Sequence, residues 1–433
     1  MNRTRKLLLT GAAVASLVLS GCAGTSSSGT VEQNDPNGKV TLDVWSNHPA
    51  NSKDTEKEII AAFEKENPNI KIKLTDAGKD YEEVAQKFNA ALTGGQTPDV
   101  VVASDVTWYN FALNDNFAPL DDLMKKVDAK PDDYVKSLYD EYTIDGKHYA
   151  VPYARSTPLF YYNKDLFKKA GVPDRGPKTW EEWNKDFAPK LKASGVLPLS
   201  IPDGSNYLDW YFQGMIWSMG GSYSKDLTVN VADEKGVAAG KFLQDQFKND
   251  YFKATKDATV PFTTGQAAAM LESTGSLQGV EEDGRVNVGT AFLPTPEGVP
   301  GVSTGGCGLA IPANSKNQEA AAKGIAFLTN TENTVKFSQA TGYMPVRTSA
   351  VDSDETKSYI KEHPNFQTAL DQLPKTKAQD AARAYVSGGG QKIGAALDKI
   401  AQGEDVQSTF DALQKDLQKI IDSQIKPKLD KKK

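Results

Sequence analysis

After residue 38, segments with the alternating apolar pattern of strands and segments with the helical spacing of apolar residues follow one another in turn. Apolar and polar residues alternate over residues 40–45 and 70–74, which is the pattern of half-buried strands. Apolar residues recur at helical spacing over residues 52–66 and 81–92, and residues 100–102 form a continuous apolar run. Strand, helix, strand, helix and strand at these lengths predict a parallel, doubly wound α/β sheet.

The predicted strands end in polar segments, which read SNHPAN, DAGKDY and ASDVTWY. Ligands of parallel α/β sheets bind beyond the carboxyl ends of the strands, so these segments predict one wall of a binding site. Farther along, Asp145-Gly146 predicts a hairpin turn, and Thr179 with Glu182 predicts a helix start through a capping box. The C-terminal third has apolar residues at helical spacing and is expected to be helical.

The N-terminal segment predicts export and a lipid anchor. Three basic residues stand before an uncharged apolar run at residues 7–19, which is shorter than the ~20 residues that a membrane-spanning helix needs. The residues LSGC that end at Cys22 then fit the lipobox of bacterial lipoproteins, whose cysteine is acylated after cleavage. We expect a signal peptide at residues 1–21, a lipid on Cys22 and a flexible tether over residues 22–38. The alternative is an ordinary signal peptide that happens to carry a cysteine.

The composition of the mature chain excludes some classes of binding partner. Without the three basic residues of the signal, 47 Lys and Arg face 56 Asp and Glu, a formal charge of −9. Nucleic-acid binding needs a net basic surface, so no nucleic acid is expected as a partner. Acylation of Cys22 leaves Cys307 without a partner for an intrachain disulfide. The roughly 400 remaining residues exceed what one hydrophobic core usually serves, which predicts two lobes.

The chain shows no motif for catalysis. His48, His148 and His363 are far apart, so the sequence predicts no metal site and no cofactor. Neither a Gly-x-Ser-x-Gly nucleophile turn nor a P-loop occurs. Cys307 could act as a nucleophile, but a small residue in a tight backbone segment is the favoured interpretation. The sequence therefore gives no support to catalysis, and the protein is not expected to be an enzyme.

Aromatic residues lie in irregular segments instead of at regular core spacing. Aromatic faces combined with hydroxyls and amides are how proteins hold polyols and sugars, although core packing is the better interpretation of any single ring. The set is Trp45, Tyr81, Trp108, Tyr109, Tyr207, Trp210, Trp217 and Tyr343.

Three longer stretches carry a family resemblance. They read STPLFYYNKDLFKKAGVPDRGPKTWEEW, then LESTGSLQG before VNVGTAFLP, and finally GGCGLAIPANSKNQEAAAKGIAFLTNTENTVKFSQATGYMPV. In this order, and with the closing helices, they resemble the extracellular solute-binding proteins of ABC importers, family 1. The likeness covers nearly the whole mature chain.

The resemblance implies a fold and a mode of action. The fold would be the two-lobed, type II periplasmic-binding-protein fold, an α/β architecture whose discontinuous lobes are joined by a hinge. The expected lobes are residues 39–154 plus 297–342 and residues 155–296 plus 343–433. The protein would be a lipid-anchored monomer on the extracellular face of the cell membrane. It would capture a small solute by hinge closure and deliver it to the permease subunits of an ABC importer.

The polar residues of the expected cleft are similar to those of the family's glycerol-3-phosphate-binding branch, which suggests glycerol-3-phosphate or a glycerophosphodiester. That likeness implies a phosphate site of hydroxyls, a glycine amide and an arginine, with an acid for the glycerol hydroxyls and two aromatic residues for packing. The implied hydroxyls are those of Tyr81, Ser156, Ser276 and Tyr343, the amide is that of Gly306, and the arginine is Arg383. The implied acid is Asp105, and the two aromatic residues are Tyr207 and Trp210.

Some departures from the branch leave alternatives open. Arg155 adds a positive charge beside the predicted site and is a further candidate, and Lys392 or Arg347 could replace Arg383 at the phosphate. A neutral mono- or oligosaccharide is the alternative ligand, because relatives hold sugars on the same scaffold. Two other classes are a surface hydrolase, which would alter its ligand, and a signalling receptor, which would partner a sensor kinase.

Overall fold

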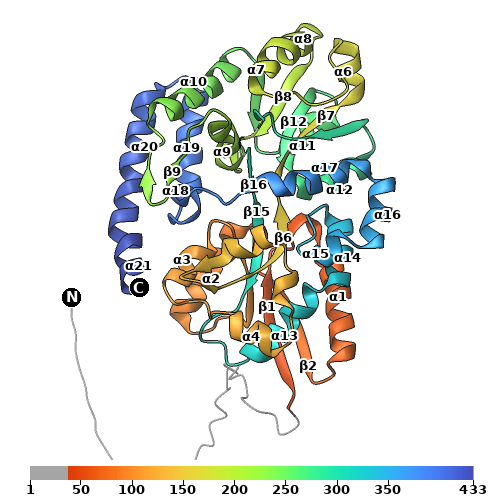
Figure 1. The fold of residues 1–433 in the computed structure, drawn as a ribbon, viewed down its shortest axis with the longest axis vertical. Coiled ribbons are helices and arrows are strands. Elements are labelled where there is room, and N and C mark those ends of the chain that lie inside the picture. Colours follow the sequence, from red (N-terminus) through yellow and green to blue (C-terminus); the bar gives the residue numbers. More distant parts are fainter. Residues whose placement is uncertain (1–37, 298, 300, 433) are drawn as a thin grey trace, which may run out of the picture.

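Two five-stranded sheets, one above the other, form the framework of the protein (Figure 1). The computed structural model describes residues 38–297, 299 and 301–432, so the predicted signal peptide, the lipidated Cys22 and nearly all of the predicted tether lie outside the described residues. The first sheet has the order β2-β1-β3-β15-β6 and the second the order β11-β8-β12-β7-β13.

The first sheet begins as the hydrophobic pattern predicts. Strands β1 and β2 run parallel, as do β1 and β3, and the helices α1 and α2 connect them. Ile59, Ile60 and Phe63 of α1 are buried, and α2 starts where the side chain of Asp80 accepts a hydrogen bond from the Glu83 amide. The strands of this sheet are β1 (Val40–Ser46), β2 (Ile70–Asp76), β3 (Val100–Ser104), β6 (Val151–Ser156) and β15 (Gly305–Ala310).

Strand β15 comes from a distant part of the chain and lies antiparallel between β3 and β6. Gly306 has φ +94, and a Cβ there would lie 2.0 Å from the Ala154 carbonyl oxygen. Only glycine fits this close approach of two backbones. The pairing of β15 with β6 also shifts register between Cys307 and Gly308, which re-aims the strand at the edge of the cleft.

The second sheet is also mixed. Strand β8 runs parallel to β11 and β12, whereas β7 runs antiparallel to β12 and β13. Its strands are β7 (Pro158–Asn163), β8 (Leu197–Pro202), β11 (Phe252–Thr255), β12 (Ala267–Ser273) and β13 (Val288–Ala291). The spatial order differs from the chain order, because β12 lies between β8 and β7.

Three segments meet where the two sheets join. Thr157 is the single residue between β6 and β7, and its Oγ1 donates to the Ser303 carbonyl at 3.2 Å. Gln372 Nε2 donates to the same Thr157 Oγ1 at 3.1 Å. Strands β14 (Val302–Ser303) and β16 (Thr376–Lys377) pair in parallel beside this point. The join between the two sheets is therefore short and hydrogen-bonded.

The chain after Tyr343 stays with the first sheet for several residues. Arg347 Nε donates to the Thr329 carbonyl at 2.6 Å, and the Ser349 amide donates to Asp133 at 3.0 Å. Hydrogen bonds to the second half then come from Tyr359, whose hydroxyl donates to Gln278 of α12 (Leu277–Asp283) at 2.9 Å, and from Asn365, whose carbonyl accepts from Thr290 Oγ1 at 3.0 Å. The lobe boundaries stay a prediction, and these contacts favour a last crossing within α16 (Asp354–Glu362).

Helices cover both sheets (Figure 1). The first sheet is accompanied by α1 (Lys53–Glu66), α2 (Tyr81–Gly94), α3 (Trp108–Leu113), α4 (Asp121–Lys126), α5 (Lys136–Tyr139), α13 (Gln318–Leu328), α14 (Thr331–Thr341) and α15 (Thr348–Val351). The second is accompanied by α6 (Lys164–Ala170), α7 (Trp180–Glu182), α8 (Ala188–Ala193), α9 (Leu208–Ser218), α10 (Glu234–Lys248), α11 (Thr259–Thr263), α12 (Leu277–Asp283), α17 (Pro364–Gln372), α18 (Ala381–Ala384), α19 (Gly389–Ala401) and α20 (Val406–Ile420). Short ladders are formed by β4 (Thr143–Ile144) with β5 (Lys147–His148) and by β9 (Ser224–Lys225) with β10 (Thr228–Val229).

The last helix, α21 (Lys426–Lys432), extends from the second half of the molecule to α3 of the first half (Figure 1). Lys428 Nζ donates to Asn114, and Lys432 Nζ pairs with Asp115. Asn110 of α3 donates to the Tyr385 carbonyl at 2.9 Å, and the rings of Tyr109 and Tyr385 stack 3.6 Å apart. The two halves therefore touch along α3 and the residues that follow it. Within the described part of the chain, no helix combines the length and apolar character needed to cross a membrane.

Candidate ligand-binding site

The site lies between the two halves, at the carboxyl ends of the first strands. Asp105 directly follows β3, and its amide donates to the Gly306 carbonyl of β15 at 2.9 Å. Tyr81 is the first residue of α2, which follows β2. Parallel sheets bind ligands beyond the carboxyl ends of their strands, and the sequence predicted one wall of the site there. Asp105 and Tyr81 lie just beyond the carboxyl ends of β3 and β2.

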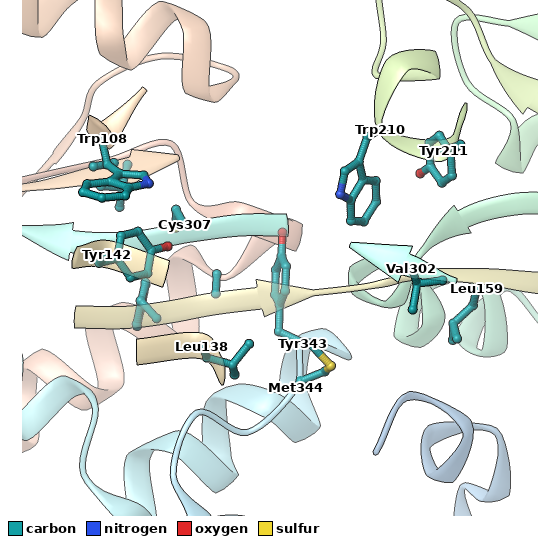
Figure 2. Packing of buried hydrophobic residues seen from close by; sticks show 14 of the residues in the cluster. Trp108, Leu138, Tyr142, Leu159, Trp210, Tyr211, Val302, Cys307, Tyr343 and Met344 are labelled. Carbon is teal, nitrogen blue, oxygen red and sulfur yellow. The ribbon is translucent and has the colours of Figure 1, made fainter. Parts of the chain in front are cut away.

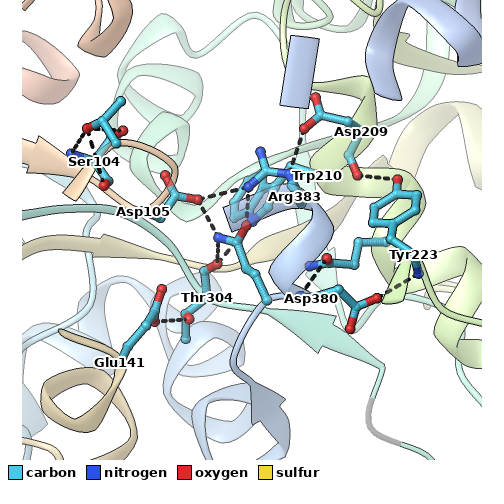
Figure 3. Close-up of polar contacts among 12 residues, drawn as sticks. Ser104, Asp105, Glu141, Asp209, Trp210, Tyr223, Thr304, Asp380 and Arg383 are labelled. Carbon is cyan, nitrogen blue, oxygen red and sulfur yellow. Dashed lines mark hydrogen bonds and ion pairs between the residues drawn. The ribbon is translucent and has the colours of Figure 1, made fainter. Parts of the chain in front are cut away.

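Arg383 is the central charge of the site (Figure 3). It is 1% exposed and forms ion pairs with Asp105 at 3.1 Å and Asp209 at 2.6 Å. Burial alone would lower the pKa of Arg383, but the two carboxylates outweigh it and the pKa is raised. Its hydrogen bonds to described residues use Nε and Nη1.

The Thr304 carbonyl ties the two halves together beneath Arg383. It accepts a hydrogen bond from Gln379 Nε2 at 2.7 Å and from Trp210 Nε1 at 3.1 Å. The Trp210 ring covers Gly305, where a Cβ would lie only 2.5 Å from the ring atom Cζ2. Gln379 also bonds to Asp105 and to Arg383. This network holds the guanidinium in one orientation between the two halves.

Two tyrosine hydroxyls meet at another edge of the site. The hydroxyl oxygens of Tyr81 and Tyr343 lie 3.5 Å apart. The ring of Tyr343 lies over Gly275. Figure 2 shows Tyr343 between Cys307 and Tyr142 on one side and Trp210 on the other. Burial raises the pKa of both tyrosines, so both remain neutral hydrogen-bond donors at neutral pH.

Cys307 lies beside these tyrosines on β15. Its side chain is fully buried, and it is the free cysteine of the described residues. Burial raises the pKa of the thiol to about 12, against smaller lowering contributions from Tyr81 and Arg155. A neutral, inaccessible thiol packs as a small apolar group.

Ser156 and Ser276 complete the predicted hydroxyl set. Ser156 ends β6 and pairs with Gly305 in the β6–β15 register. Ser276 ends the turn at residues 274–276 and bonds to the carboxyl of Glu272, whose pKa burial raises. Both serines lie in segments that adjoin the cleft, so their role as ligand contacts stays a prediction.

Arg155 is engaged away from Arg383. The guanidinium is fully buried and pairs with Glu141 at 2.5 Å, and it donates to the Tyr142 hydroxyl at 2.7 Å. Glu141 also accepts from Thr304 Oγ1, so this carboxylate connects β6 to the residue that precedes β15. These contacts give Arg155 a structural role of its own, and its predicted ligand contact gains no support from them.

The two alternative cations of the sequence prediction are also engaged elsewhere. Lys392 pairs with Asp416 at 2.7 Å, and Arg347 bonds to the carbonyls of Thr329 and Lys130. Arg383 is therefore the predicted cation that borders the cleft.

A cavity of about 110 Å³ opens beside Arg383. It is smaller than the ~300–1,000 Å³ of sites that enclose a whole small molecule, so it suits one part of a ligand. Tyr207 borders it with φ +73, a strained backbone conformation for a residue with a side chain. The lining residues are Asp80, Glu82, Val106, Gly204, Ser205, Asn206, Tyr207, Asp209, Arg383, Gly390 and Gln391.

A larger cavity of about 1020 Å³ lies elsewhere, against the β14–β16 ladder. Its walls include Phe292, Leu293 and Lys375, and it contains none of the predicted site residues. The smaller cavity is the candidate, because the predicted site residues Tyr207 and Arg383 line it and the buried ion pairs of Arg383 lie beside it. Among described residues, no group of three His, Cys, Asp or Glu side chains could hold a metal ion.

Asp209 and Gln379 are site residues that the sequence analysis missed. Asp209 precedes Trp210 on α9, and Gln379 lies one helical turn before Arg383. Their closeness in the sequence to the predicted residues Trp210 and Arg383 could have indicated them. Which of the 56 acidic residues meets the arginine is decided by tertiary packing.

Comparison with known proteins now identifies the family. The sequence model for bacterial extracellular solute-binding proteins matches residues 58–368, more than half of the chain. The chain belongs to this family. Membership confirms the family resemblance found in the sequence, and it confirms the prediction of a binding protein that is not an enzyme.

Solved structures show the same fold for this solute-binding protein. The crystal structure of UgpB from Mycobacterium tuberculosis in complex with glycerophosphocholine is 44% identical, with a TM-score of 0.86 over 89% of this chain and 100% of that chain. The GacH receptor of Streptomyces glaucescens is 22% identical, with a TM-score of 0.77 over 89% of this chain and 99% of that chain, and shows the fold alone. The predicted two-lobed, type II α/β fold is confirmed.

A curated relative of this solute-binding protein is the sn-glycerol-3-phosphate-binding periplasmic protein UgpB of Escherichia coli K12. It is 28% identical over 333 residues, which cover 72% of this chain and 75% of the relative. The predicted likeness to the glycerol-3-phosphate-binding branch is confirmed.

Proposed function

We propose that this protein binds glycerol-3-phosphate or a glycerophosphodiester in the cleft around Arg383. The observation that carries the proposal is the fixed guanidinium, which borders the cavity. A fixed arginine offers a phosphate oxygen a charge-assisted hydrogen bond. The names of the two UgpB relatives support this ligand class.

A neutral mono- or oligosaccharide has less support from the geometry. Sugars stack on an accessible aromatic face. Trp210 is 6% exposed, and its ring lies against Gly305 while its Nε1 bonds to Thr304. Tyr207 is the aromatic residue in the lining of the candidate cavity, and one ring is a small platform for an oligosaccharide.

Hinge closure is the proposed mechanism. Thr157, Ser303 and Gln372 form the hydrogen-bonded join about which the lobes pivot. The lobes are residues 39–154 plus 297–342 and residues 155–296 plus 343–433, with the last boundary moved toward α16. A ligand that contacts both lobes stabilises the closed arrangement by its differential affinity, and the membrane permease then receives it.

Titration of the chain from residue 38 onward tests the ligand class. Isothermal calorimetry with glycerol-3-phosphate, glycerophosphocholine and maltose is expected to give one-to-one binding of a glycerol phosphate and no heat with maltose. At 100 times its dissociation constant, the bound compound adds ~2.7 kcal/mol to the free energy of unfolding. Mass spectrometry should recover it unchanged. Binding of maltose alone, or a chemically altered ligand, would overturn the proposal.

The lipid anchor on Cys22 belongs to the same proposal and rests on the sequence LSGC after an apolar run. Cys22→Ala in the full chain is expected to remove the lipid, so the protein no longer pellets with membranes when cells are fractionated. Two acyl chains hold a protein stably on a membrane, whereas a protein without acyl chains makes only weak contacts with it. Metabolic labelling with an alkyne fatty acid checks acylation directly, and unchanged labelling of the variant would contradict the assignment.

A further inference from the structure

Glu272 is a half-buried acid of the second half that lies beside the predicted ligand hydroxyl of Ser276. It is the last residue but one of β12, which runs parallel to β8. The residues that follow β8 line the candidate cavity, so the carboxyl ends of both strands point toward the cleft. The sheet therefore places the Glu272 carboxyl at the edge of the cleft.

The hydrogen bonds of Glu272 come from neutral donors. Its Oε1 accepts from the Tyr211 hydroxyl at 2.8 Å and from the Ser273 amide at 2.7 Å, and the Ser276 hydroxyl bonds to the same carboxyl. No ion pair among the described residues includes Glu272, and the charge with the largest effect on it belongs to Asp257, a second acid. Burial raises the pKa of Glu272 and outweighs the lowering by these hydrogen bonds.

The other titratable groups around this carboxyl are tyrosines and one histidine pair. Burial raises the pKa of each tyrosine, so all stay neutral hydrogen-bond donors. From the first half, the segment Pro49–Asn51 packs against the turn at residues 274–276, and His48 directly before this segment pairs with Glu56. The tyrosines are Tyr161 of β7, Tyr211 of α9 and Tyr343.

The Ser276 hydroxyl has a single hydrogen, which cannot serve Glu272 and a phosphate at once. An ionised carboxylate only accepts hydrogen bonds, so it takes this hydrogen. Phosphate oxygens are acceptors as well, and they need the same hydrogen. A protonated carboxyl donates to the serine oxygen instead, which frees the serine hydrogen for the ligand. A phosphate near the turn also disfavours a second negative charge there.

We propose that Glu272 takes up a proton from the solvent when a phosphate ligand binds and that it orients the Ser276 hydroxyl toward the phosphate. This inference rests on the proposed function and adds a positioning residue that links ligand affinity to pH. The bound protein holds the proton up to a higher pH than the free protein does. Between the pKa of Glu272 in the free protein and its pKa in the complex, affinity falls up to about tenfold for each pH unit. Below and above this window, affinity is constant.

Calorimetry with glycerophosphocholine measures the proton directly. This diester has no phosphate proton that titrates near neutral pH, so proton uptake belongs to the protein. Binding is measured from about pH 5 to about pH 9, in two buffers with different heats of ionisation at each pH. We expect net proton uptake and weaker binding as the pH rises. Equal heats in both buffers at every pH would overturn the inference and leave the proposed function intact. Absence of binding by every glycerol phosphate would instead refute the proposed function.

Glu272→Gln imitates the protonated acid, because its amide donates to Ser276 at every pH. We expect the variant to bind without proton uptake, and at the alkaline end about tenfold more tightly than the wild type. A merely structural role would weaken binding at every pH, and that result would contradict the inference, as would proton uptake that persists in the variant.

Glu281→Gln is the matched control for this variant. Glu281 is an acid of α12 in the same half, where it accepts from Asn365 at 2.7 Å and pairs with His363 at 3.3 Å. Its variant should keep the proton uptake of the wild type, and its loss there would contradict the assignment to Glu272. Thermal unfolding checks the fold of both variants, and the wild-type measurement in two buffers tests the inference without any substitution.

Discussion

Replacing Arg383 with alanine is expected to abolish measurable binding of a glycerol phosphate compound and to lower the free energy of unfolding by about 3–5 kcal/mol. The variant removes the phosphate contact and leaves Asp105 and Asp209 buried without a counter-charge. Calorimetry measures the loss of binding, and chemical denaturation measures the loss of stability. This is the largest single-residue effect that we expect.

Two further variants separate binding from folding. Arg383→Lys keeps a positive charge beside Asp105 and Asp209 but loses the planar fork, so it should fold and bind about 10–100-fold more weakly. Arg285→Ala is the control, because Arg285 forms an exposed pair with Asp283, and such pairs contribute at most about 1 kcal/mol. Full affinity in a folded Arg383 variant would remove this residue from the phosphate site.

Trp210→Ala is the second large effect. We expect ligand affinity to fall by about 1–3 kcal/mol and the free energy of unfolding by about 3–5 kcal/mol. The ring is 6% exposed, covers Gly305 and bonds to the Thr304 carbonyl, so its removal opens a void between the halves beside Arg383. Calorimetry and denaturant titration of the same preparation measure the two quantities.

A matched tryptophan supplies the control for this prediction. Trp183 is fully buried in the second half, and its Nε1 donates to Gln246 at 3.0 Å. Trp210→Phe and Trp183→Phe both remove one buried indole hydrogen bond. Only Trp210→Phe should lower affinity, while both should lower stability. Equal affinities in the two variants would place Trp210 outside the ligand's reach.

The regular part of the fold was predictable from local patterns. The predicted helix at residues 52–66 is α1 (Lys53–Glu66), and the hairpin at Asp145-Gly146 joins β4 and β5. Thr179 caps its helix by accepting a hydrogen bond from the Glu182 amide at 3.1 Å. Hydrophobic period, turn residues and capping side chains act over a few residues, so the sequence displays them directly.

The partners of the site residues were not predictable in the same way. Arg155 and Arg383 both looked available in the sequence, yet Arg155 is engaged by Glu141 and Tyr142 while Arg383 borders the cavity. Their environments depend on how β6, β15 and α18 pack, and these elements are more than 70 residues apart in places. The family resemblance indicated the candidate site residues, and only the structure shows which side chains they pair with.

The state of Cys307 bears on how long the protein can survive outside the cell. Burial raises the pKa of this thiol to about 12, so it stays protonated at neutral pH, and only the thiolate reacts quickly with oxidants. With no solvent contact either, the sulfur resists sulfenic acid formation and cross-linking between copies. Cys307 therefore fills space in β15 without adding a site of oxidative damage.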